Sequence, residues 1–143
     1  QFDLESLFPG ATALSLFFFL ALSPGIWEEL VFRGSLLSAM RRDWPWHKVV
    51  FWQALYFALV HASIYRLLPT GVLGALLAII ALRARSVMPA IVMHVTYNAV
   101  MVLGAAGHLG FVEDEWWAYA PWAAIPGVIL LALPAREDGS RAR

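Results

Sequence analysis

Long apolar runs, separated by short charged or Pro/Gly-rich stretches, constrain this chain more than any other feature. Of its 143 residues, 61% are hydrophobic and only 14% are charged, and the mean hydropathy is +0.69. A soluble domain typically contains about 45–50% apolar and about 25% charged residues. The imbalance indicates that lipid surrounds the folded chain, so we expect an all-α, polytopic transmembrane helical bundle.

The lengths of the apolar runs predict about five to six membrane helices within a single domain, residues 1–143. Several runs are shorter than the roughly 20 residues that a helix needs to cross a bilayer, and a buried helix pair in a very apolar soluble protein is the alternative. Flanking Trp, Tyr and Arg residues, or local thinning of the bilayer, would let short runs cross. The predicted segments are 11–27, 26–40, 49–62, 71–82, 87–107 and 116–133.

An interior breaker and the two ends of the chain complete the predicted organisation. Ser23-Pro24-Gly25 is expected to break the chain between the first two segments. The polar tail, 134–143, is expected to be disordered, and a chain that starts with Gln1 is expected to be a fragment or a processed product.

Charge is distributed unevenly among the connecting loops. Arginine and lysine gather in loops 41–48 and 83–86 and in the C-terminal tail, whereas residues 113–115 are all acidic. Because positive loops remain in the cytoplasm, we expect both basic loops and the C-terminus there, in a multi-pass protein of the cell membrane. The formal net charge is zero, so no strong field steers nucleic acid, and the lack of cysteine excludes disulfides and a cysteine nucleophile.

Ionisable residues occur inside the apolar segments, where each is costly and therefore a functional hypothesis. In the stretch 28–34, Glu29 and Arg33 are four apart and are expected to pair on one helix face. Glu28 is five residues from Arg33 and is expected to keep a free carboxylate. Taken alone, the Glu29–Arg33 pair has a purely structural interpretation.

Two further apolar segments carry polar side chains. His61 lies near the end of one, where it could also cap a helix, and His94 and Asn98 lie four apart on one face of another. A histidine and a carboxamide supply donors that suit a developing oxyanion, although they could also link helices by hydrogen bonds. An acid, two histidines and an amide on three apolar helices favour one shared site.

These residues resemble the motifs of the CPBP family of intramembrane proteases, which includes CAAX prenyl endopeptidases and bacterial bacteriocin-processing or immunity proteins. The family's segments Glu-Glu-x-x-x-Arg, Phe-x-x-x-His and His-x-x-x-Asn occur here in that order, within a core at about 26–102. They are Glu28-Glu29 with Arg33, Phe57 with His61, and His94 with Asn98.

The resemblance implies a glutamate-type intramembrane endopeptidase whose substrate is a membrane-associated peptide or protein. Glu28 and His61 would activate a water, and His94 with Asn98 would hold the oxyanion. Glu29 and Arg33 would support the site. The substrate itself is not identified by the sequence.

Three alternatives remain beside this interpretation. Two histidines and a glutamate could hold zinc with an open fourth position, but the His-Glu-x-x-His signature is absent and Asn98 is a poor zinc ligand, so we expect no cofactor. A non-catalytic immunity or scaffold protein could bind a peptide in the same pocket. A channel or transporter could relay protons, but it would spread its polar residues along a pathway.

Overall fold

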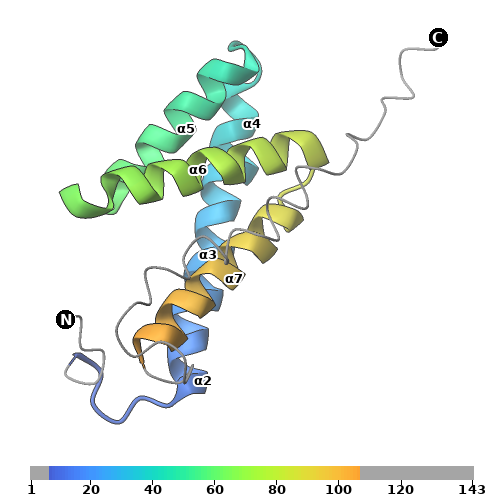
Figure 1. The fold of residues 1–143 in the computed structure, drawn as a ribbon. Helices are drawn as coiled ribbons and strands as arrows, with labels where there is room; N and C mark the ends of the chain where they lie inside the picture. Colours follow the sequence, from blue (N-terminus) through green and yellow to red (C-terminus); the bar gives the residue numbers. More distant parts are fainter. Residues whose placement is uncertain (1–6, 107–143) are drawn as a thin grey trace.

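A long helical rod begins the described part of the protein. The computed structural model describes residues 7–106, and the rod runs from Ala13 to Met40 through five consecutive helical segments (Figure 1). Thr12 caps its start, because the Thr12 hydroxyl oxygen accepts a hydrogen bond from the Ser15 backbone N–H. The segments are α2 (Ala13–Leu16), η1 (Phe17–Leu22), α3 (Ser23–Glu29), η2 (Leu30–Leu36) and α4 (Leu37–Met40), where η denotes a π-helix.

The break expected at Ser23-Pro24-Gly25 does not occur, and that prediction was wrong. The wide π-helical segment η1 ends immediately before Ser23, whose N–H donates to the carbonyl of Phe18, five residues earlier. A proline inside a regular α-helix clashes with the carbonyl four residues before it. The wider π turn provides room for the Pro24 ring, so the helix continues through the proline.

Three more helices follow the rod. They are α5 (Trp46–Val60), α6 (Ile64–Ala84) and α7 (Met88–Ala105). The loops predicted at 41–48 and between 62 and 71 are both shorter than expected, since α5 begins at Trp46 and α6 at Ile64. Pro45 immediately precedes α5 and ends the turn after the rod, while Pro69 lies within the second turn of α6.

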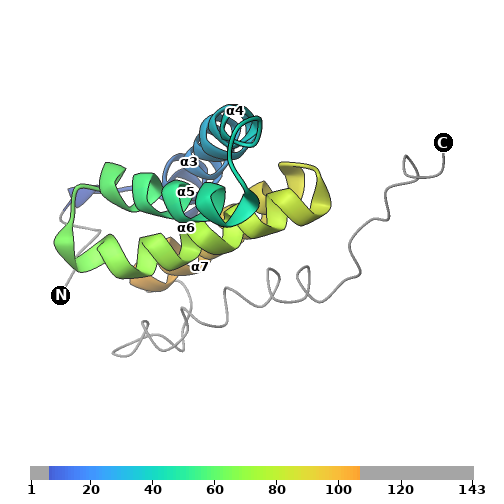
Figure 2. The same ribbon diagram turned by 90° about the horizontal axis from the view of Figure 1, so that it is seen from above.

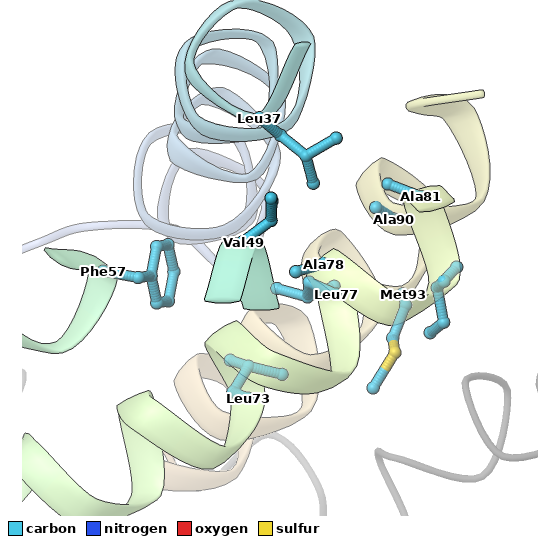
Figure 3. Close-up of a cluster of buried hydrophobic side chains, with 10 residues drawn as sticks. Leu37, Val49, Phe57, Leu73, Leu77, Ala78, Ala81, Ala90 and Met93 are labelled. Atoms are coloured by element: carbon cyan, nitrogen blue, oxygen red, sulfur yellow. The ribbon is translucent and has the colours of Figure 1, made fainter. Parts of the chain in front are cut away.

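The helices pack in two groups around one apolar core. Helices α5 and α6 run side by side and antiparallel across the rod, and α7 packs along α3 and η1 (Figures 1 and 2). The core lies where these groups meet, and Figure 3 shows Leu37 of the rod, Val49 and Phe57 of α5, and Leu73 and Leu77 of α6 around it (Figure 3). These five side chains are buried.

Three helices among the described residues are long and apolar enough to cross a membrane: Ala13–Met40, Ile64–Ala84 and Met88–Ala105. The all-α prediction is confirmed for residues 7–106, whereas the predicted number of membrane helices, five to six, is not. Helix α5 has only 15 residues, which is short for a crossing. The predicted span at 116–133 and the tail at 134–143 lie outside the described residues.

Candidate active site

Glu29 and Arg33 form an ion pair inside the protein. Arg33 Nη1 donates to Glu29 Oε1 over 2.8 Å, and both side chains have a relative exposure of 0%. The pair expected from the four-residue spacing is therefore present, even though the intervening turn begins the π-helix η2 rather than continuing α3. Taking two charges out of water is costly, and mutual pairing offsets that cost.

Helices α5 and α6 complete the surroundings of the Arg33 guanidinium. Its Nη2 donates to the backbone carbonyl of Gly74 in α6 over 2.8 Å. The ring centroid of Phe57 in α5 lies 4.5 Å from the guanidinium carbon, a cation–π contact. Arg33 thus joins the rod to both helices of the second group.

His94 of α7 brings the third segment to the two acids. The His94 ring is buried, and its Nδ1 lies 2.8 Å from Glu29 Oε1. Because Glu29 Oε1 also accepts from Arg33, it acts as a carboxylate acceptor and His94 Nδ1 is the donor. This hydrogen bond fixes the orientation of the ring and directs Nε2 toward Glu28.

Glu28 has the free position expected for it. Its Oε2 lies 3.9 Å from His94 Nε2, which is too far for a direct hydrogen bond. That oxygen is buried and has no hydrogen-bond partner within residues 7–106, while the Glu28 side chain as a whole is 33% exposed. A carboxylate of this kind can accept from a water that enters from outside.

His61 lies at the C-cap of α5 and, like His94, contacts the Phe57 ring. Its Nδ1 donates to the Phe57 backbone carbonyl over 2.7 Å, since a carbonyl oxygen can only accept. The Phe57 centroid is 4.9 Å from the His61 ring and 5.5 Å from the His94 ring. In the neutral ring, this bond leaves Nε2 of His61 as the acceptor.

The structure therefore unites four of the six predicted site residues directly. Glu28, Glu29, Arg33 and His94 form one cluster, and His61 is connected to it through Phe57. Asn98 is half-buried on α7, one turn after His94, and it makes no hydrogen bond to the described part of the chain.

Two glycines, whose roles the sequence interpretation missed, set the distances within this cluster. A Cβ on Gly25 would lie 2.7 Å from Val95 Cγ2, and one on Gly74 would lie 3.1 Å from Phe57 Cβ. Both glycines let helices approach closely, Gly25 between α3 and α7 and Gly74 between α5 and α6. Small residues are enriched where membrane helices meet, so glycines within apolar segments were the available signal.

One residue near His61 has an unusual backbone. Ala62 follows the histidine with a φ of 48°, a left-handed conformation that is uncommon for residues other than glycine. It ends α5 and leads into α6 within three residues. Backbone strain of this kind clusters at functional sites.

The zinc alternative needs several ligands around one point. No three His, Cys, Asp or Glu side chains between residues 7 and 106 are grouped so that they could hold a metal ion. Glu29, the acid nearest His94, is already paired with Arg33. The arrangement instead offers a free carboxylate, an oriented imidazole and a second imidazole nearby, which is a set of groups for acid–base chemistry.

Comparison with known protein families gives a match that covers the candidate site. The family described as type II CAAX prenyl endopeptidase, Rce1-like, matches residues 10–100, which is more than half of the chain and includes all six predicted site residues. No curated protein and no solved structure shows significant similarity to the chain. The match confirms the CPBP resemblance inferred from the motifs, and the chain belongs to the Rce1-like family of type II CAAX prenyl endopeptidases.

Proposed function

We propose that this protein is a multi-pass intramembrane endopeptidase that hydrolyses a peptide bond in a membrane-associated peptide or protein. Membership of an endopeptidase family suggests the class of reaction. The observation that carries the proposal is the position of Glu28, whose buried Oε2 lies 3.9 Å from His94 Nε2. Arg33 forms its ion pair with Glu29 and not with Glu28.

Glu28 and His61 are the proposed groups that activate water. A carboxylate that is not neutralised by an arginine can accept a proton from a water bound beside it. His61 supports this role because its Nδ1–H is committed to the Phe57 carbonyl, so its Nε2 can take a proton. Attack of the water on the scissile carbonyl would then place a negative charge on the carbonyl oxygen. When this intermediate collapses, the C–N bond breaks and the proton taken from water passes to the leaving amine.

His94 and Asn98 are the proposed groups that stabilise this oxyanion, from one face of α7. Because the Nδ1–H of His94 is bonded to Glu29, His94 donates to the oxyanion from Nε2 as the imidazolium. The Glu29–Arg33 pair is a positioning element, because Glu29 Oε1 holds the His94 ring through Nδ1. A ring held in this way needs no reorganisation when charge develops, which is the basis of electrostatic catalysis. No resident cofactor is part of the proposal.

The test is a cleavage assay with purified protein in proteoliposomes that contain a farnesylated CAAX peptide and, separately, a pool of membrane-protein peptides read by mass spectrometry. We expect Glu28→Gln and His61→Ala to lower the cleavage rate by about 10²–10⁴-fold, the usual contribution of a general base. His47→Ala and Asp43→Asn, which alter exposed residues away from the cluster, should cleave at the wild-type rate.

Three results would contradict the proposal or part of it. If wild type binds the peptides but cuts none of them, the protein is a non-catalytic binding or immunity protein. If Glu28→Gln and His61→Ala cut as fast as wild type, the assigned roles are wrong. If a chelator abolishes cleavage and zinc restores it, the reaction is metal-dependent.

A further inference from the structure

An open pocket of about 540 Å³ lies beside the cluster, between the end of the rod and the connection from α6 to α7. Its described lining contains three arginines, two serines and no carboxylate. The polar side chains are Arg33, Ser38, Arg41, Arg85 and Ser86. A cavity with this lining is chemically suited to an anion.

The three arginines come from separate parts of the fold. Arg33 extends from η2, Arg41 follows the last residue of the rod, and Arg85 follows the last residue of α6. Arg33 is also nine-tenths buried or more, and its Nε is a buried donor with no partner among residues 7–106. The Arg33 side chain has no exposed surface, so it borders the pocket from within, while Arg41 and Arg85 are exposed.

Arg85 has a backbone conformation that a different residue would adopt more easily. Its φ is 52° and its ψ is 33°, the left-handed region, at the C-cap of α6. This position after a helix is usually glycine, because a Cβ is unfavourable there. A long cationic side chain at a strained position that lines a pocket points to a role for that side chain.

The location of the pocket indicates which anion it meets. The candidate spans Ala13–Met40 and Ile64–Ala84 end there, and Met88–Ala105 begins there. Residues immediately beyond a span lie at the level of the lipid headgroups, and basic pockets between membrane helices bind anionic headgroups. Guanidinium groups match phosphate oxygens through paired N–H donors.

We propose that this pocket binds a phosphate group, carried by an anionic phospholipid headgroup or free in solution. Arg41 and Arg85 contact the phosphate from the two loops, and the Ser38 and Ser86 hydroxyls add neutral donors. Arg33 belongs to the inner wall of the pocket. The site is distinct from Glu28, and its existence does not depend on peptide cleavage.

The experiment measures binding to the purified full chain in a neutral detergent by calorimetry. The probes are dioctanoyl phosphatidylglycerol, dioctanoyl phosphatidylcholine and inorganic phosphate. We expect the anionic lipid to bind, and Arg41→Gln to weaken its affinity by about tenfold, as loss of a charge-assisted hydrogen bond does. Arg42→Gln is the matched control, since Arg42 is adjacent, exposed and outside the pocket, and it should change the affinity by less than about twofold.

The probes also separate the two sources of phosphate. Tighter binding of phosphatidylglycerol than of inorganic phosphate identifies a lipid site, and equal affinities identify a site for soluble phosphate. The proposal is overturned if neither anion binds, if phosphatidylcholine binds as tightly as phosphatidylglycerol, or if Arg42→Gln weakens binding as much as Arg41→Gln. Because Arg41 and Arg42 are both exposed, misfolding is not expected to obscure the comparison.

Discussion

His94 is the residue on which the geometry of the candidate site depends most. Through Nδ1 it shares Glu29 Oε1 with Arg33, and through Nε2 it faces Glu28. The two neighbouring acids in the sequence therefore have different environments, one paired twice and one without a hydrogen bond to the described residues. We expect a substitution of Glu28 to impair mainly catalysis. A substitution of Glu29 should instead impair mainly the stability of the fold.

Glu29→Gln is expected to destabilise the protein by about 3–5 kcal/mol, because it leaves the Arg33 charge buried without its counter-charge. Thermal unfolding in detergent measures the effect. Glu28→Gln should unfold close to the wild-type temperature, since Glu28 is partly exposed and has no ion pair with Arg33.

A double variant separates charge from packing. Glu29→Gln combined with Arg33→Met removes both charges and should recover part of the lost stability. If the double variant is less stable than Glu29→Gln alone, the hydrogen bond from Arg33 to Gly74 and the Phe57 contact contribute more than the ion pair.

Local spacing predicted part of this site. The Glu29–Arg33 pair was predicted from the four-residue spacing on one helix. The five-residue spacing between Glu28 and Arg33 predicted that the Glu28 carboxylate would not pair with Arg33. The bond between His94 and Glu29 joins residues 65 apart in the sequence, and only the packing of α7 against α3 creates it. No periodicity along one chain segment contains that information.

At the scale of the elements, close helix contacts at glycine decide how the cluster is assembled. Gly74 is packed against Phe57 and Ala54 of α5, whereas a Cβ on Gly71 of the same helix would meet only Ala58 Cβ, at an ordinary 3.7 Å. The two positions are three residues apart and differ in the space around them. They form a matched pair for testing the contact.

Gly74→Ala is expected to destabilise the protein by about 1–3 kcal/mol, the usual range for overpacking a filled core. It should also lower cleavage, because it displaces Phe57, which contacts Arg33, His61 and His94. Gly71→Ala gains helix propensity without a clash and should be neutral or more stable by up to about 1 kcal/mol. Equal unfolding temperatures for the two variants would show that the α5–α6 contact has room for a methyl group at Gly74.

The positions of the helices were predictable from the apolar runs, but their boundaries were not. Pro24 was interpreted as a break because proline ends regular α-helices, and the π-helical segment η1 that accommodates it has no local sequence signal comparable to a proline or a cap. Similarly, Ile64 to Thr70 reads as a loop because it contains Arg66 and Pro69, yet it forms the first two turns of α6.

At the scale of the whole molecule, the pocket shows how the connecting loops are arranged. Arg41, Arg85 and Ser86 line one cavity, so the loop after the rod and the loop after α6 lie at the same end of the protein. We therefore expect both loops to face the same side of the membrane. Their positive charge favours the cytoplasmic side.

The absence of cysteine from the chain permits a direct test of this orientation. Asp43→Cys and Ser86→Cys should react with a membrane-impermeant maleimide in inverted vesicles but not in intact cells. Ala11→Cys, which precedes the first candidate span, should show the opposite pattern. Labelling of Asp43→Cys and Ser86→Cys from opposite sides would contradict the arrangement.

The π-helical segment η2 also affects which changes in chain length the protein can accept. A single π turn within an α-helix is equivalent to one inserted residue whose rotation is absorbed locally. Removal of exposed Ser35 from this segment would let an ordinary α-helix form, while Glu29 and Leu37 would keep nearly the same relative directions. Helix α5 contains no π turn that could absorb a deletion. Removal of Ala54 would therefore turn Phe57 by about 100°, away from both histidines. One-residue deletions are therefore far less disruptive in the segment that follows the two acids than in the helix that carries His61.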